Sequence, residues 1–122
     1  MLLQKEDTQA KVSIKSYQVG EIKLNIGLFN EVILLVNGDK KDFDGAKSFI
    51  DLSFEDLKEQ LAEKPEILII GTGEKHQILP ISLTKQINDM GIAVEAMASR
   101  QACHTYQVLM YEQRVIYALI YP

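Results

Sequence analysis

The stretch 67-ILIIGTG-73 decides the fold class, because it joins four apolar residues to two glycines around a threonine. A short apolar run that ends in turn residues is typical of a strand buried on both faces of a parallel sheet. The glycines also raise a question of function. A glycine-rich exit from such a strand can bind a phosphate, or it can only turn the chain.

Helices and strands are predicted to alternate around this strand. The predicted helices have apolar residues at helical spacing and span residues 53–64, 82–91 and 99–113. The neighbouring apolar strands span residues 66–70, 92–97 and 114–121. Ser53 and Asp56 predict a capping box, and Gly91 predicts a helix C-terminus. This alternation predicts a mainly parallel sheet that is covered by helices.

The first third of the chain predicts antiparallel strands instead. The short strands predicted there span residues 12–18, 21–26 and 31–36. Asn37-Gly38 predicts a tight hairpin turn, and the lysines of residues 39–43 suit an edge strand. We therefore predict a single α/β domain of three layers over residues 12–122. Its mixed, mainly parallel central sheet carries antiparallel N-terminal hairpins and about three helices, and residues 1–11 form a loose arm.

Composition argues against several classes of function. The formal charge of −4 opposes binding to a nucleic-acid backbone. No apolar run reaches the roughly 20 residues that cross a bilayer, so we expect a cytoplasmic protein without membrane insertion. The single cysteine and two histidines, without metal-ligand spacing, predict no metal site, and no motif calls for a cofactor.

An ordered set of motifs covers residues 13 to 121. It consists of the Gly71-Thr72-Gly73 turn, Pro80, Gly91-Ile92, "VEAM" at 94–97, "ACHTYQVLMYEQR" at 102–114 and the apolar final strand. In these features the chain resembles the Mth-domain family, which includes an adipogenesis-associated protein and a mitochondrial complex I assembly factor. The resemblance implies a three-layer α/β fold with a mixed sheet, and it implies no enzyme activity.

The chain departs from that family's pattern in a few places. Gln107 stands where the family usually has asparagine, and Ser99 stands where threonine is common. Gln113 replaces a frequent glycine, and the chain has no tryptophan. The changes at Gln107 and Ser99 are chemically mild, so they leave the expected fold intact, but they weaken the transfer of any particular site from the family.

The glycine turn has two interpretations. It does not match a dinucleotide-binding fingerprint, because His76 takes the place of the third glycine and the next helix is expected only at Ser82. In the first interpretation the glycines serve only as a tight exit from a buried strand. Alternatively, Gly71, Thr72 and Gly73 form an anion or ligand site with the start of the last helix.

The second interpretation depends on strands 67–70 and 92–97 running parallel. Their ends then place the glycine turn beside Ser99 and Arg100, which could hold a small anion or a partner's carboxylate. Glu95 lies between apolar neighbours, so we expect a buried carboxylate paired with Arg114 or Arg100, or a general acid or base lining the site.

The last predicted helix has two faces. The residues expected to face the core are Ala102, Cys103, Tyr106, Leu109 and Met110. His104, Val108 and Tyr111 lie on the other side, where the N-terminal hairpin covers them or a partner protein binds them. Adjacent helix positions point about 100° apart, so Cys103 and His104 are not predicted to form a nucleophile and its base.

Two functions from different classes remain. The leading hypothesis is a non-enzymatic binding or assembly-type domain that acts through contacts with a protein partner or a second copy. The alternative is a small-molecule or anion-binding protein, or an enzyme, with its site at the glycine turn and the start of the last helix. Glu95 or His76 would assist there. No catalytic residue is predicted.

Overall fold

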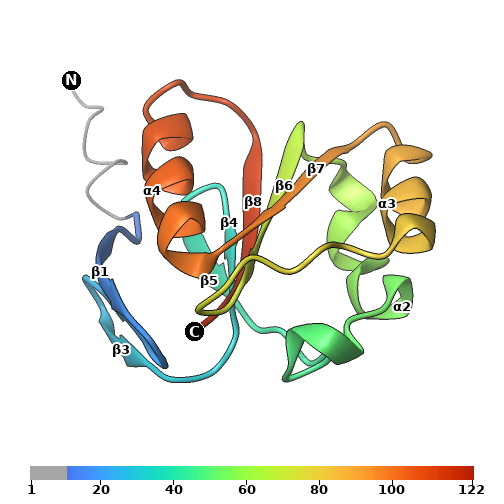
Figure 1. Ribbon diagram of the computed structural model, residues 1–122. Helices are drawn as coiled ribbons and strands as arrows, with labels where there is room; N and C mark the ends of the chain where they lie inside the picture. Colours follow the sequence, from blue (N-terminus) through green and yellow to red (C-terminus); the bar gives the residue numbers. More distant parts are fainter. Residues whose placement is uncertain (1–10) are drawn as a thin grey trace.

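A five-stranded mixed sheet forms the centre of the protein in the computed structural model, which describes residues 11–122 (Figure 1). Its strands, in the order β5-β4-β8-β6-β7, are β5 (Asp39–Lys41), β4 (Ile33–Val36), β8 (Ile116–Tyr121), β6 (Ile67–Thr72) and β7 (Ala93–Met97). Strands β6, β7 and β8 run parallel, whereas β4 runs antiparallel to both of its neighbours. The predicted α/β class with a mixed sheet is confirmed.

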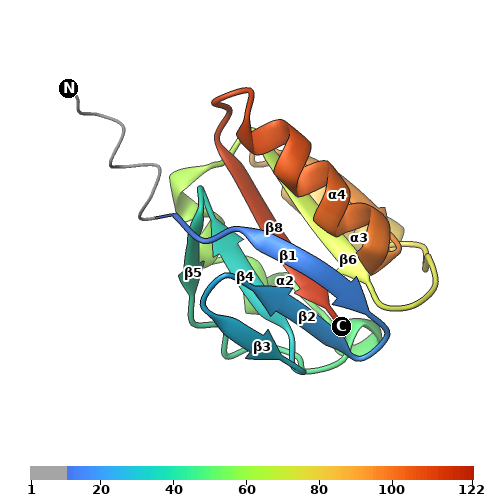
Figure 2. The same ribbon diagram turned by 90° about the vertical axis from the view of Figure 1, so that its left-hand side faces the viewer.

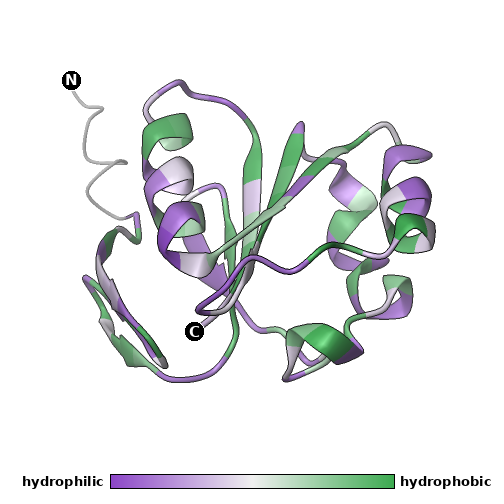
Figure 3. Cartoon of the chain, viewed as in Figure 1, coloured by the Kyte–Doolittle hydropathy of each residue, from purple (hydrophilic) through white to green (hydrophobic). Residues whose placement is uncertain are grey.

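Strands β6 and β8 are interior strands of the sheet because both of their faces are buried, and their residues are largely hydrophobic (Figure 3). Alternate residues of a strand point to opposite faces. Leu119 of β8 accordingly packs into the core on one side of the sheet, and its neighbours Ala118 and Ile120 pack into the core on the other side. The sheet therefore separates two hydrophobic cores, as expected of a three-layer domain.

One face of the sheet is covered by α4 (Ser99–Met110) and by a second sheet. That sheet is antiparallel and consists of β1 (Ile14–Gln18), β2 (Glu21–Leu24) and β3 (Gly27–Phe29). Figure 2 shows β1 lying beside α4. Ala102, Cys103 and Tyr106 of α4 are buried against the central sheet, as predicted.

The other face is covered by α3 (Ile81–Asn88), α2 (Phe54–Leu57) and the 3₁₀ turns η2 (Phe49–Asp51) and η3 (Gln60–Glu63). The prediction of one continuous helix over residues 53–64 was wrong, because the segment divides into α2 and η3. So short a helix is only marginally stable, and its last turns often tighten into 3₁₀ geometry. The predicted capping box is present, with the Ser53 N–H donating to the Asp56 carboxylate over 3.1 Å.

A predicted hairpin turn and a predicted helix end are confirmed by their backbone angles. Asn37 and Gly38 join β4 to β5 with φ values of 51° and 90°, as a type I′ turn requires. Gly91 ends the helical segment of α3 with a φ of 83°. The predicted arm lies outside the described residues except for Lys11, whose Nζ donates to the Asn37 carbonyl over 3.2 Å.

Candidate functional site

The carboxyl ends of the three parallel strands meet at one edge of the central sheet. Strand β6 continues into Gly73, β7 leads into the start of α4, and β8 ends at Tyr121. The Ser99 N–H donates to the Gly73 carbonyl over 2.8 Å. The predicted approach of the glycine turn to the last helix is therefore present.

The Ser99 side chain joins three elements at this edge. Its hydroxyl accepts from the Gly73 N–H over 2.8 Å and donates to the Tyr121 carbonyl. Ser99 is completely buried. A Cβ atom placed on Gly71 would lie 2.7 Å from Ser99 Oγ, so Gly71 allows α4 to pack directly on β6.

Thr72 organises the loop that follows β6. Its buried hydroxyl donates to the Lys75 carbonyl over 2.6 Å and accepts from the Gln77 N–H over 3.1 Å. Gly73 has a φ of 109°, which few other residues adopt. These contacts give the turn a structural role, and a ligand of Thr72 or Ser99 would have to displace them.

Arg100 is directed toward β1. Its Nη1 donates to the Tyr17 carbonyl over 3.3 Å, and its guanidinium lies 5.2 Å from the centre of the Tyr17 ring. The sequence did not single out Tyr17, because its contact with α4 spans 83 positions of the chain.

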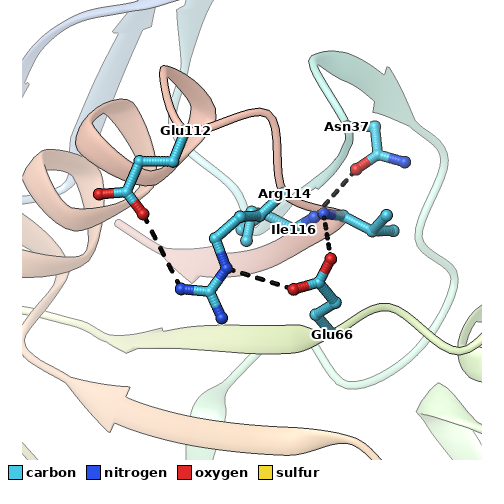
Figure 4. Close-up of polar contacts among 6 residues, drawn as sticks. Asn37, Glu66, Glu112, Arg114 and Ile116 are labelled. Atoms are coloured by element: carbon cyan, nitrogen blue, oxygen red, sulfur yellow. Dashed lines mark hydrogen bonds and ion pairs between the residues drawn. The ribbon is translucent and has the colours of Figure 1, made fainter.

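The expectation of a buried carboxylate at Glu95 was wrong. Strand β7 is an edge strand, so the Glu95 side chain is exposed even though its neighbours in sequence are apolar. Arg114 is not its partner, because Arg114 pairs with Glu66 over 3.2 Å and with Glu112 over 3.9 Å (Figure 4). This ion-pair group lies where β6 and β8 begin, at the opposite end of the sheet from the glycine turn.

A cleft of about 500 Å³ opens at the carboxyl ends of β6 and β8, and we call it the strand-end cleft. It is lined by Gly20, Asn30, Glu31, Val32, Lys47, Ser48, Phe49, Ile50, Thr72, Gly73, Gln77, Tyr121 and Pro122. These residues come from turns that are far apart in the sequence. Clefts of this kind, beyond the carboxyl ends of parallel strands, commonly bind ligands in α/β folds.

Exposed aliphatic side chains lie in the lining of the strand-end cleft or next to that lining in sequence. Ile50 lines the cleft, and Val19 and Ile78 are the sequence neighbours of the lining residues Gly20 and Gln77. These three side chains, which we call the apolar rim, are between 58% and 83% exposed. The rim was not predicted from the sequence, because its three residues are far apart in the chain.

The outer face of α4 is only partly covered. His104 lines a smaller cleft between β1 and α4, which places the N-terminal strand beside this residue. Val108 and Tyr111 are exposed, so among the described residues nothing buries this end of the face. Coverage by the N-terminal hairpin, one of the two alternatives for the outer face of α4, therefore does not hold for Val108 and Tyr111.

Burial controls the chemistry of the reactive groups near this helix. It raises the pKa of the Cys103 thiol to about 11, so the thiol is protonated at neutral pH. It likewise raises the pKa of Tyr106 to about 12, and the Tyr106 hydroxyl accepts a hydrogen bond from the Gly38 N–H. Within residues 11–122 no group of three or more His, Cys, Asp or Glu side chains could hold a metal ion.

The fold defines a three-layer α/β domain with a mixed central sheet and a second, antiparallel sheet beside α4. Residues 14–121 match the family described as "Protein of unknown function (DUF498/DUF598)". The chain belongs to this family. A solution structure of a Bordetella pertussis protein, described as an Mth938-like domain, has the same fold with a TM-score of 0.78 and 24% identity, covering 100% of this chain and 92% of that one. The resemblance to the Mth-domain family is thereby confirmed.

Two relatives carry descriptive names. The "13 kDa major membrane protein" of Francisella tularensis is 37% identical, and the alignment covers 98% of each chain. The "NADH dehydrogenase [ubiquinone] 1 alpha subcomplex assembly factor 3" of Xenopus tropicalis is 32% identical over 62% of this chain, but only 42% of that relative is covered. In the part of the chain that the structure describes, no helix is long and apolar enough to span a membrane.

Proposed function

We propose that this protein is a non-enzymatic domain of the assembly type, which acts in the cytoplasm by binding a protein partner or a second copy of itself. The relationship to a complex I assembly factor supports a role of this class. A protein that assists assembly needs a surface for its client more than it needs a reactive group. The proposal therefore depends on an accessible binding surface.

The apolar rim is the observation that carries this proposal. An exposed large aliphatic side chain does not gain the free energy that burial of its apolar surface would provide. Clusters of such side chains at a cleft are typical of protein-binding sites. The charged residues in the lining are Glu31 and Lys47, which pair with each other over 3.8 Å at the surface. Exposed apolar side chains beside a cleft with a partly polar, partly apolar lining match the mixed character of protein interfaces.

Charge substitutions in the rim test the proposal. Ile50→Lys and Ile78→Lys place a charge on the rim without disturbing a buried side chain. We expect them to reduce capture of the partner, or self-association, by at least about tenfold. Ile26→Lys is the control, because Ile26 is another exposed isoleucine, in the turn between β2 and β3, and does not line the cleft.

Quantitative affinity capture measures the partner, and sedimentation velocity measures self-association. If both rim variants behave like the Ile26 control, the rim does not bind the partner. Tyr111→Glu then examines the face formed by His104, Val108 and Tyr111 in the same two assays. Unchanged behaviour of all these variants would remove the basis for the proposal.

A further inference from the structure

A second, smaller cleft lies between β1 and the first half of α4, and we call it the β1–α4 cleft. Its volume is about 220 Å³, enough for a small polyatomic ion or a single functional group. It is lined by Ile14, Lys15, Ser16, Tyr17, Arg100, Cys103, His104 and Gln107. This cleft is separate from the strand-end cleft, since the two have no lining residue in common.

The lining of the β1–α4 cleft is positively charged. Lys15 and Arg100 contribute two cations, and none of the lining residues carries a carboxylate. Neither cation has an ion-pair partner among residues 11–122. This contrasts with the formal charge of −4 for the whole chain. A cleft with cations only attracts an anion.

Arg100 is held in place before any ligand arrives. One of its N–H groups donates to the Tyr17 carbonyl, and the guanidinium lies over the Tyr17 ring. A guanidinium has five N–H donors, so most of them remain for another acceptor. Its planar fork suits two oxygen atoms of one phosphate or carboxylate group.

Tyr17 supplies a second, independent observation. The residue is only 7% exposed, and its hydroxyl is buried without a hydrogen-bond partner in residues 11–122. Buried hydroxyl groups in proteins almost always have a partner, so an unpaired one needs an explanation. An oxygen atom of an anion that displaces the groups covering this hydroxyl would accept the hydrogen bond that the hydroxyl can donate.

From these observations we propose that the β1–α4 cleft binds a small oxyanion, which is either free phosphate or the phosphate or carboxylate group of a small molecule. Arg100 and Lys15 supply the charge, and the Tyr17 hydroxyl supplies a buried donor. This site differs from the glycine turn, where the hydroxyl groups of Thr72 and Ser99 already have partners within the protein. It is also independent of the proposed protein contacts at the apolar rim.

Titration of the ¹⁵N-labelled protein tests this site directly. Inorganic phosphate and acetate are added separately, with chloride adjusted to keep the ionic strength constant. We expect saturable shifts of the amide signals in residues 14–17 and 100–107 with at least one of the two anions. Phosphatidylcholine vesicles with and without phosphatidic acid form a third arm, which distinguishes a lipid headgroup from a free anion.

Three variants separate binding from structure. Arg100→Gln should weaken the affinity by at least about tenfold, because it removes a charge-assisted contact. Arg114→Gln is the matched control at the other end of the sheet and should leave the affinity unchanged. Tyr17→Phe removes the unpaired hydroxyl, so it should raise the unfolding midpoint of the free protein and yet weaken anion binding.

The outcomes are distinguishable. Saturable shifts that are lost in Arg100→Gln and weakened in Tyr17→Phe support the site. Shifts spread over the whole surface, equal affinities for the two arginine variants, or a Tyr17→Phe protein with unchanged affinity would overturn it. Binding to vesicles that contain phosphatidic acid, without any response to phosphate or acetate, would also overturn a site for small anions. If the anion site is refuted, the proposed binding of a protein partner is not affected, because that proposal is tested with different variants.

Discussion

Replacing Gly71 by alanine tests the role of the glycine turn most directly. The new Cβ would lie 2.7 Å from Ser99 Oγ, 2.9 Å from Ile120 Cγ2 and 3.1 Å from the Ala102 Cβ. Gly71 is not among the residues with a positive φ, so alanine meets no backbone strain at this position. The cost is therefore one of overpacking between β6, β8 and α4.

Overpacking by one methyl group in a tight core typically costs about 1–3 kcal/mol. The reduced freedom of the unfolded chain offsets about 0.4–1 kcal/mol of this. We expect Gly71→Ala to lower the free energy of unfolding by roughly 1–2 kcal/mol, or the midpoint by roughly 3–8 °C in a domain of this size. Urea denaturation followed by circular dichroism measures the change.

A double-mutant cycle with Ser99→Ala identifies the cause. Ser99→Ala alone should cost about 1–3 kcal/mol, because it leaves the Gly73 N–H and the Tyr121 carbonyl without their partner. It also removes the oxygen nearest to the new Cβ. The cost of Gly71→Ala should then be smaller by roughly 0.5–1 kcal/mol in the Ser99→Ala background.

Gly91→Ala serves as the control for this cycle. Gly91 has a φ of 83° and no atom within 4 Å of its Cβ position, so its cost of about 1 kcal/mol is backbone strain alone. That cost should add to the cost of Ser99→Ala. A Gly71→Ala protein within about 0.5 kcal/mol of the wild type, or a fully additive Gly71–Ser99 cycle, would refute this account of the turn.

Other expected results follow from local geometry. Gln113 has a φ of 58°, so Gln113→Gly should raise the free energy of unfolding by roughly 0.5–1 kcal/mol in urea denaturation, and a loss of stability would contradict the strain. Asn37→Ala should cost about 2 kcal/mol, because it strains a left-handed position and removes the acceptor of the Ile116 N–H, whereas Asn37→Gly should cost less because it loses only the hydrogen bond. Burial raises the pKa of the Cys103 thiol from 9.0 to about 11. The thiol is neutral in both the folded and the unfolded chain below pH 9, but between about pH 9 and about pH 11 it ionises mainly in the unfolded chain. The free energy of unfolding should therefore fall as the pH rises through this range. Denaturation at several pH values should show a smaller alkaline loss in Cys103→Ala, and an equal loss in both proteins would argue against the shift.

Features set by neighbouring residues were predictable from the sequence. The Asn37-Gly38 turn and the helix end at Gly91 each require a positive φ, which glycine and asparagine adopt most easily. The capping box at Ser53 depends on residues three positions apart. Glu95 was misjudged because an apolar run does not reveal whether its strand is central or at an edge, which depends on pairing between strands.

The candidate sites were harder to predict from the sequence. The approach of Gly73 to Ser99 followed from parallel strands, and this expectation was met. The partner of Arg100 did not follow, because a long side chain at a helix start can turn toward several elements. Its contact with Tyr17 needed the antiparallel sheet to pack on α4, an arrangement that no local motif encodes.

The sequence by itself determined the elements of this protein, its turns and its family, since these depend on short-range periodicity, on backbone preferences and on an ordered set of motifs. Tertiary structure alone decided which side chains meet. It brought Gly20, Ile50 and Gln77, which are far apart in the sequence, to one cleft, and it placed Lys15 and Arg100 on another. The physical reason is that burial and long-range strand pairing depend on the whole folded chain, so isolated residues acquire a common role only after the layers have packed.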